Sequence, residues 1–169
     1  FEQRYAAFRG LNLTFEVREG IIKHSHDYSA SDHPELAEYL LDQRPPVEAQ
    51  LIDLTDEIAY NTADLDDGYE AHLLSLDEIR AGVPLFERFY REVEQVYPNV
   101  PDKLKFNETL KRVLNRFVDD LIRTTQARVT AAEIRTLDDV RNHPNRLAAF
   151  SPAVDAERKQ NKDFLYKTL

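Results

Sequence analysis

The sequence predicts an all-α fold that occupies residues 1–169 as a single domain. Only four residues are glycine, no segment alternates apolar and polar residues like a strand, and apolar residues instead recur three and four positions apart. A composition of 42% hydrophobic and 31% charged residues is ordinary for a globular protein, and 169 residues can bury one core. We expect neither internal repeats nor low-complexity tracts.

Proline and small polar residues mark where the helices of the first half begin. Ser, Thr, Asn and Asp side chains accept hydrogen bonds from the free N–H groups of a first helical turn, and proline already has a helical backbone angle. The expected elements are a helix capped by Asn12 or Thr14 that ends near Lys23, a polar loop over residues 24–34, a short helix over residues 34–41, and a long helix from Pro45-Pro46 to about Gly68.

The same signals order the second half. Ser75 is followed three positions later by Glu78, which is the pattern of a reciprocal capping box. A longer run carries apolar residues at helical spacing: Leu104, Leu110, Val113, Leu114, Phe117 and Leu121. The expected elements are a helix capped by Ser75, a helix from Pro84 to Val96, a helix from Lys103 to Ala127, a short helix begun by Thr130, and a last helix from Ser151-Pro152 to the end of the chain.

Charge and composition exclude several classes of function. The formal net charge of -9 disfavours a broad nucleic-acid surface, because such surfaces gather Lys and Arg. No apolar run approaches the roughly 20 residues of a membrane-spanning helix, and the absence of cysteine excludes disulfides and thiolate metal sites. We expect no nucleic-acid or membrane partner and a cytoplasmic location. Because the chain starts at Phe1 and contains no Met, we expect a piece of a longer protein.

The long helix of the first half carries the most informative pattern. At about 100° per residue, one face holds apolar residues, and a second apolar strip lies beside it. The remaining face holds Asp56, Tyr60 and Asp64, spaced four residues apart. Carboxylates suit hard divalent cations, a tyrosine ring can pack on a sugar, and a second carboxylate can accept a hydrogen bond from a hydroxyl. The alternative is a solvated acidic face. The first strip comprises Leu51, Leu54, Ile58, Thr62 and Leu65, and the second Ile52, Ala59 and Ala63.

Three blocks in this chain resemble, in order, the deoxyguanosinetriphosphate triphosphohydrolases of the HD superfamily. The central block is DEIAYNTADLDDG, from Asp56 to Gly68. The first is RYAAFRGLNLTFEVREGIIKH, from Arg4 to His24, and the third is AFSPAVDAERKQNKDFLYKTL, from Ala149 to Leu169. The resemblance implies the C-terminal portion of an HD-type helical bundle, and an enzyme that hydrolyses deoxynucleoside triphosphates, dGTP among them, to deoxynucleoside and tripolyphosphate.

The resemblance also implies roles for individual residues. Asp56 matches the last metal ligand of the family, and the metal expected at such an oxygen-rich site is Mg²⁺ or Mn²⁺. Tyr60 matches a residue that lies against the deoxyribose where a 2'-hydroxyl would be, and Asp64 matches a residue near the 3'-hydroxyl. Lys105 and Arg112 belong to a basic stretch that in relatives contributes cations to the triphosphate or to contacts between subunits; the alternative is that these are plain surface cations. The expected partners are a deoxynucleoside triphosphate and further copies of the chain.

The remaining metal ligands of the family, a His and a His-Asp pair, match nothing in this chain. His26-Asp27 is a literal His-Asp pair, but it lies in the polar segment HSHDYSASDHP, and we interpret it as a loop. A single carboxylate does not make a catalytic metal site, so we assign no catalytic residue and expect the chain alone to be inactive. Two alternatives remain: a catalytically silent helical interaction or regulatory module, and another HD-type phosphohydrolase.

Overall fold

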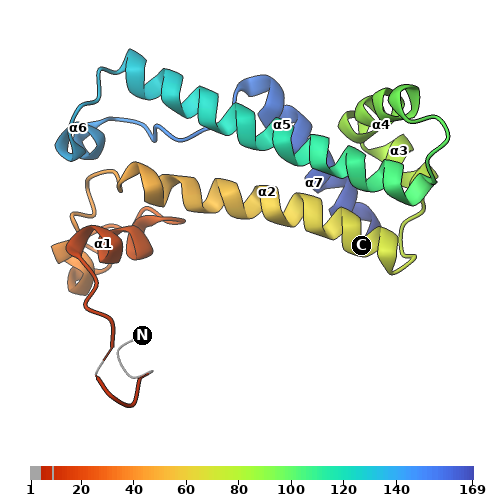
Figure 1. Ribbon diagram of the computed structural model, residues 1–169. Helices are drawn as coiled ribbons and strands as arrows, with labels where there is room; N and C mark the ends of the chain where they lie inside the picture. Colours follow the sequence, from red (N-terminus) through yellow and green to blue (C-terminus); the bar gives the residue numbers. More distant parts are fainter. Residues whose placement is uncertain (1–4, 9) are drawn as a thin grey trace. The chain divides into compact units, whose positions relative to one another are not determined.

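The computed structural model describes residues 5–8 and 10–169 and confirms the all-α prediction for them. Within this part of the chain no strand occurs. Arg4 and Arg9 of the first resembling block lie outside the described residues. The elements are the helices α1 (Phe15–Lys23), α2 (Val47–Glu70), α3 (Leu76–Gly82), α4 (Pro84–Val96), α5 (Asp102–Ala131), α6 (Leu137–Asn142) and α7 (Pro152–Thr168), with the 3₁₀ helix η1 (Pro34–Tyr39) (Figure 1).

Most helix starts coincide with the expected caps. The Thr14 hydroxyl accepts a hydrogen bond from the backbone N–H of Val17, and Ser151 caps α7 in the same way. Ser75 and Glu78 form the expected capping box at the start of α3, in which each side chain binds the backbone N–H of the other residue. These local hydrogen bonds explain why the helix starts were visible in the sequence.

The prediction that Thr130 begins a helix is wrong. Thr130 lies inside α5, and its hydroxyl donates to the carbonyl of Gln126 at 2.9 Å. The next helix, α6, begins after Thr136. The Thr136 hydroxyl accepts from the backbone N–H of Asp139, and the Asp139 carboxylate accepts from the backbone N–H of Thr136. A threonine inside a helix satisfies its hydroxyl on the preceding turn, so its presence alone does not mark a start.

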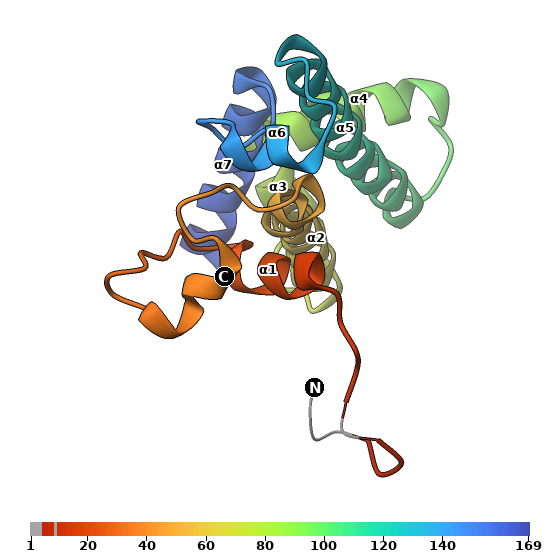
Figure 2. The ribbon, with the colours of Figure 1, turned by 90° about the vertical axis from the view of Figure 1, so that its left-hand side faces the viewer.

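The chain forms two compact units, and the boundary between residues 53 and 54 falls within α2. Unit 1 comprises residues 1–53 and 134–147, and α1, η1 and α6 belong to it (Figure 2). Unit 2 comprises residues 54–133 and 148–169, with α3, α4, α5 and α7. Segments far apart in the sequence therefore meet within each unit.

Unit 1 has charged residues at its centre. Glu19 is fully buried, and its carboxylate accepts from Lys23 Nζ at 2.9 Å and from Arg141 Nη2 at 2.7 Å. Lys23 also donates to the carbonyl of Leu40 at 2.8 Å. Together these bonds join α1, η1 and α6. α1 also lies close to Ala49, because a Cβ added at Gly20 would be only 3.1 Å from Ala49 Cβ, and a larger residue there would have to displace that neighbour slightly.

Aromatic rings dominate the core of unit 2. The Phe106 ring stacks on Tyr69 at a centroid distance of 4.2 Å and contacts Phe86 at 5.3 Å. Phe86 in turn lies 6.0 Å from Tyr90, so the rings form a continuous cluster across α2, α4 and α5. Burial of such rings is the main source of stability in a helical core of this kind.

The apolar periodicity of α5 is only partly a core pattern. Val113, Phe117 and Leu121 are buried as expected, whereas Leu104 and Leu114 are exposed. The second apolar strip of α2 behaves similarly, since Ile52 is exposed and Ala59 and Ala63 lie at the surface. A helix with apolar residues around much of its circumference buries the side that its neighbours cover, and the sequence does not specify that side.

Candidate functional site

The row of polar residues predicted on the long helix lies on α2, within unit 2. Asp56 is exposed, the Tyr60 side chain is 61% exposed, and Asp64 is half-buried. On the opposite side of the helix Ile58 and Leu65 are buried, and the Thr62 hydroxyl donates to the Ile58 carbonyl at 2.9 Å. The packing of this apolar side fixes the direction of the polar row.

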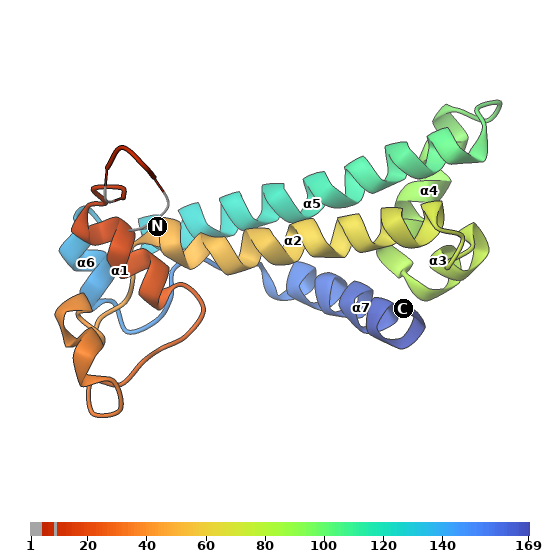
Figure 3. The same cartoon turned by 90° about the horizontal axis from the view of Figure 1, so that it is seen from below.

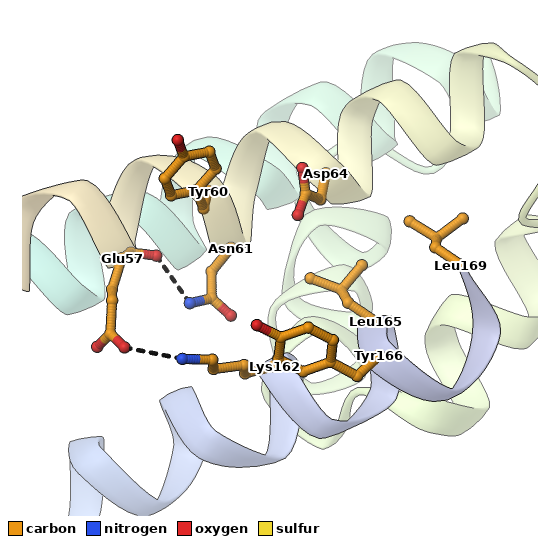
Figure 4. Close-up of a pocket in the computed structure, with 8 residues that line it drawn as sticks. All are labelled: Glu57, Tyr60, Asn61, Asp64, Lys162, Leu165, Tyr166 and Leu169. Atoms are coloured by element: carbon orange, nitrogen blue, oxygen red, sulfur yellow. Dashed lines mark hydrogen bonds and ion pairs between the residues drawn. The ribbon is translucent and has the colours of Figure 1, made fainter.

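Two members of the row, Tyr60 and Asp64, line a cavity of about 410 Å³, which we call the α2–α7 hollow. Its lining residues are Glu57, Tyr60, Asn61 and Asp64 from α2, and Lys162, Leu165, Tyr166 and Leu169 from the C-terminal segment (Figure 4). Asp56 is not among them. The hollow thus brings the two predicted sugar-binding residues together and leaves the predicted metal ligand outside.

An ionic network fixes the two helices that form the hollow. Glu57 on α2 accepts from Lys162 Nζ at 3.0 Å and pairs with the buried Arg158, both on α7. Arg158 Nη2 also donates to Asp155 at 2.7 Å. A further bond runs from Asn161 Nδ2 to the backbone carbonyl of Asn61 at 3.2 Å. Charge-assisted hydrogen bonds therefore hold α7 beside α2, where Figure 3 shows it.

Sequence reasoning missed four polar or aromatic residues of the hollow: Glu57, Asn61, Lys162 and Tyr166. Glu57 and Asn61 repeat the four-residue spacing of the row one position along, and Lys162 and Tyr166 repeat it on α7. The sequence therefore contains the spacing of these residues on each helix. It does not show that α7 lies beside this part of α2.

The two predicted triphosphate ligands lie elsewhere in unit 2. Lys105 is buried, and its Nζ lies 3.9 Å from Glu94 Oε1 and 3.8 Å from Asp102 Oδ1. Arg112 Nη1 lies 3.3 Å from Glu92 Oε2, and its Nε lies 3.7 Å from Glu108 Oε1. Neither residue lines the α2–α7 hollow. Each cation already has two carboxylates within ion-pair distance, and its role towards a phosphate stays a prediction.

A second cavity of unit 2, of about 620 Å³, lies between α2 and α5. Ala59 and Ala63 line it with Leu110 and Leu114 of α5. Lys103 lies at the same cavity and pairs with both Asp66 and Glu70. Lys111 also lines this cavity.

The His26-Asp27 pair has the loop setting that we expected. The Asp27 carboxylate pairs with Arg44 Nη1 and with Arg146 Nη2, each at 3.1 Å. Burial alone would raise the pKa of Asp27, but the hydrogen bonds and charges of the two arginines outweigh it and lower that pKa. The carboxylate therefore acts as an anchor of unit 1, and the pair has no helical scaffold.

Metal ligands do not cluster in the part of the chain that the structure describes: residues 5–8 and 10–169 contain no group of three or more His, Asp or Glu side chains that could hold an ion. Asp56 in particular is exposed. The described residues thus do not form a metal centre by themselves. Among the helices of the same residues, none combines the length and apolar character needed to cross a bilayer.

Comparison with known proteins gives a consistent picture. No family model matches the chain. Curated proteins named deoxyguanosinetriphosphate triphosphohydrolase-like protein do match it. The one from Ralstonia nicotianae is 44% identical over 169 residues, which cover 99% of this chain and 43% of that protein. Those from Thiobacillus denitrificans and Bordetella pertussis are 43% and 42% identical, over 97% and 99% of this chain and 43% and 44% of theirs.

The chain spans less than half the length of the curated relatives that it matches. The match covers 99% of this chain, so the matched region includes both α2 and α7, the two elements of the hollow. The chain is therefore a homologue of a segment of the deoxyguanosinetriphosphate triphosphohydrolase-like proteins.

Proposed function

We propose that the chain is part of an enzyme that hydrolyses deoxynucleoside triphosphates, dGTP among them, to deoxynucleoside and tripolyphosphate. The observation that carries the proposal is the joint presence of Tyr60 and Asp64 in one hollow. An aromatic ring and a carboxylate one helical turn apart suit a sugar, whose apolar face packs on the ring while a hydroxyl donates to the carboxylate. The names of the relatives support the same substrate class.

In this proposal the two residues read different parts of the deoxyribose. Tyr60 stands at the outer edge of the hollow (Figure 4), where its ring would occupy the space that a 2'-hydroxyl needs. Asp64 would accept a hydrogen bond from the 3'-hydroxyl. Specificity for deoxynucleotides would then arise from exclusion at one position and recognition at the other.

The proposal also assigns Asp56 as one ligand of a divalent cation, Mg²⁺ or Mn²⁺. The described residues offer Asp56 no companion ligands in a cluster, so a metal site would need ligands from beyond them. We therefore expect the 169-residue chain alone to release no tripolyphosphate from dGTP in the presence of either ion. Turnover by the purified chain that Asp56→Ala abolishes would contradict this assignment.

The test of the proposed function uses the full-length protein that contains this chain. Tyr60→Ala is expected to lower the ratio of kcat/KM for dGTP to that for GTP, because the space for a 2'-hydroxyl opens. Tyr97→Ala, which removes an exposed ring outside the hollow, is the matched control. An unchanged ratio in Tyr60→Ala removes the sugar-reading role.

Asp64→Asn tests the second contact. Loss of a charge-assisted hydrogen bond is expected to weaken substrate binding by about 1–3 kcal/mol, seen as a higher KM. Asp67→Asn on the same helix makes the same charge change at an exposed position away from the hollow and should leave KM unaltered. If neither dGTP nor another dNTP is hydrolysed by the full-length protein, the silent interaction module becomes the better explanation.

A further inference from the structure

The α7 wall of the hollow is backed by α3 through a contact that leaves no room for a side chain at Gly82. Gly82 is the last residue of α3, and a Cβ added there would lie 2.2 Å from Cδ2 and 2.3 Å from Cε2 of Phe164 on α7. Carbon atoms in ordinary contact lie about 3.5–4.0 Å apart. The Phe164 ring therefore rests directly on the backbone of α3, and even a methyl group at Gly82 would displace the ring by about 1 Å or more.

Space, rather than backbone conformation, explains the glycine at this position. Gly10 is the one glycine with a positive φ among the described residues, so Gly82 has a backbone conformation that any residue can adopt. An alanine there would favour the helix more than glycine does. Gly68 on α2 supports the same arrangement, because a Cβ there would lie 2.8 Å from Cδ1 of Leu74, in the turn that leads into α3. Both glycines therefore allow a close approach that any side chain would prevent.

Phe164 lies on the side of α7 that faces away from the hollow. Lys162 and Tyr166 line the hollow (Figure 4), and each lies two residues from Phe164, which is about 200° around the helix. On the hollow side, the ion pairs of Glu57 with Lys162 and Arg158 tie α7 to α2. α7 is thus held between α2 and α3, and a push on Phe164 from α3 moves α7 towards α2.

We propose that the contact between Gly82 and Phe164 sets the width of the α2–α7 hollow and thereby limits the size of the ligand that the hollow admits. Gly82 is a positioning residue, because it lines no part of the hollow and acts through Phe164 and α7. The inference rests on the proposed function for the choice of ligand, whereas the contact itself follows from packing. A narrower hollow excludes a large ligand before a small one, because the steric clash is greater for the large ligand.

Two substrates of different size test the inference in the full-length protein that contains this chain. The base of dGTP has two fused rings and that of dTTP has one; if dTTP is not hydrolysed, its Ki as a competing ligand replaces its KM. Gly82→Ala is expected to raise KM about tenfold for dGTP and by a smaller factor for dTTP, with little change in kcat. Ala81→Ser, which adds one atom at an exposed position of the same helix, should alter neither value.

Rescue separates positioning from a general loss of stability. Adding Phe164→Ala to Gly82→Ala removes the ring that the methyl group meets and is expected to restore the original ratio of the two KM values. A crystal structure of the full-length Gly82→Ala variant gives a readout that needs no activity: around Phe164, α7 should lie about 1 Å closer to α2. If Gly82→Ala does not fold, Phe164→Leu alone tests the contact, because the smaller side chain lets α7 move away from α2 and should lower KM for dGTP relative to dTTP.

Three results would overturn the inference. In the first, α7 keeps its place in Gly82→Ala because the half-buried Phe164 ring turns towards solvent. In the second, the ratio of the two KM values is unchanged although α7 has moved, and in the third the altered ratio persists after Phe164→Ala is added. Hydrolysis of dGTP by the full-length protein together with any of these results removes the role of Gly82 and leaves the proposed function. If that protein hydrolyses no deoxynucleoside triphosphate, the proposed function fails, and the crystal structure still decides whether Gly82 sets the width of the hollow.

Discussion

Units 1 and 2 differ in what they bury. The centre of unit 1 is an ionic group, in which the carboxylate of Glu19 binds Lys23 and Arg141. The centre of unit 2 is a set of aromatic rings around Phe106. A buried carboxylate is tolerated only with its partners, whereas a ring requires only close packing, so the two interiors should respond differently to the loss of one member.

One physical rule nevertheless acts in both units. In unit 1, burial lowers the pKa of Lys23, against the opposing effect of its hydrogen bond to Glu19. In unit 2, burial raises the pKa of Tyr90 to about 12, with the charge of Asp102 acting in the same direction. Loss of solvent disfavours the charged form of each group. The comparison shows that a charged interior requires compensation by specific partners, and the following variants test how strongly.

The largest effect is expected from Phe106→Ala in unit 2. Phe106 is fully buried, and its removal deletes the contacts with both Tyr69 and Phe86. The free energy of unfolding should fall by about 3–5 kcal/mol in a denaturant titration. Leu104→Ala, an exposed position on the same helix, should change it by less than about 0.5 kcal/mol. Similar losses in the two variants would show that the rings are not the core.

Glu19→Gln should have the next largest effect, in unit 1. It leaves the buried Lys23 and the partly buried Arg141 without their common carboxylate, which is expected to cost about 3 kcal/mol. Hydrogen exchange of the amides of α1 and α6 measures the loss locally. Joint replacement of Glu19 by Leu and of Lys23 and Arg141 by Met should be far less harmful than Glu19→Gln. Equal damage from both variants would refute the role of unpaired charge.

The capping boxes provide the same local device in both units. Ser75→Ala at α3 and Thr136→Ala at α6 each remove a side-chain acceptor of a first-turn N–H. Each is expected to destabilise its helix by about 1 kcal/mol, measured by exchange of the first-turn amides. Thr130→Ala is the control, because Thr130 caps nothing. A larger loss in Thr130→Ala than in Thr136→Ala would contradict the assigned helix start.

The smallest effect concerns pH. Arg146 and Arg44 lower the pKa of Asp27 below its ordinary value of 3.8, against the effect of burial. The contribution of Asp27 is therefore complete above pH 3.8 and is lost as the pH falls through the lowered pKa. Because the side chain is 63% exposed, we expect less than about 1 kcal/mol. Asp27→Asn should remove this part of the acid dependence of unit 1, and an identical acid profile would contradict it.

Local signals in the sequence were sufficient for most helix starts and for the shared face of Tyr60 and Asp64. The caps at Thr14 and Ser75 could be predicted because a cap forms within three residues. The spacing of Tyr60 and Asp64 placed both on one face of α2, since helical geometry alone determines that. The same reasoning failed at Thr130, where the next element was set by the later capping box at Thr136.

Only the tertiary structure decided which residues from distant parts of the chain meet. Lys162 reaches the hollow because α7 lies beside α2, and Glu19 can be buried because Arg141 comes to it from 122 residues further along the chain. The periodicity of apolar residues shows how much of a helix is apolar but not which side a neighbouring helix covers. For this reason the exposure of Leu104 could not be predicted from the sequence. Local hydrogen bonds are encoded by adjacent residues, whereas the pairing of charges and the lining of a cavity depend on packing between elements that the sequence alone does not order.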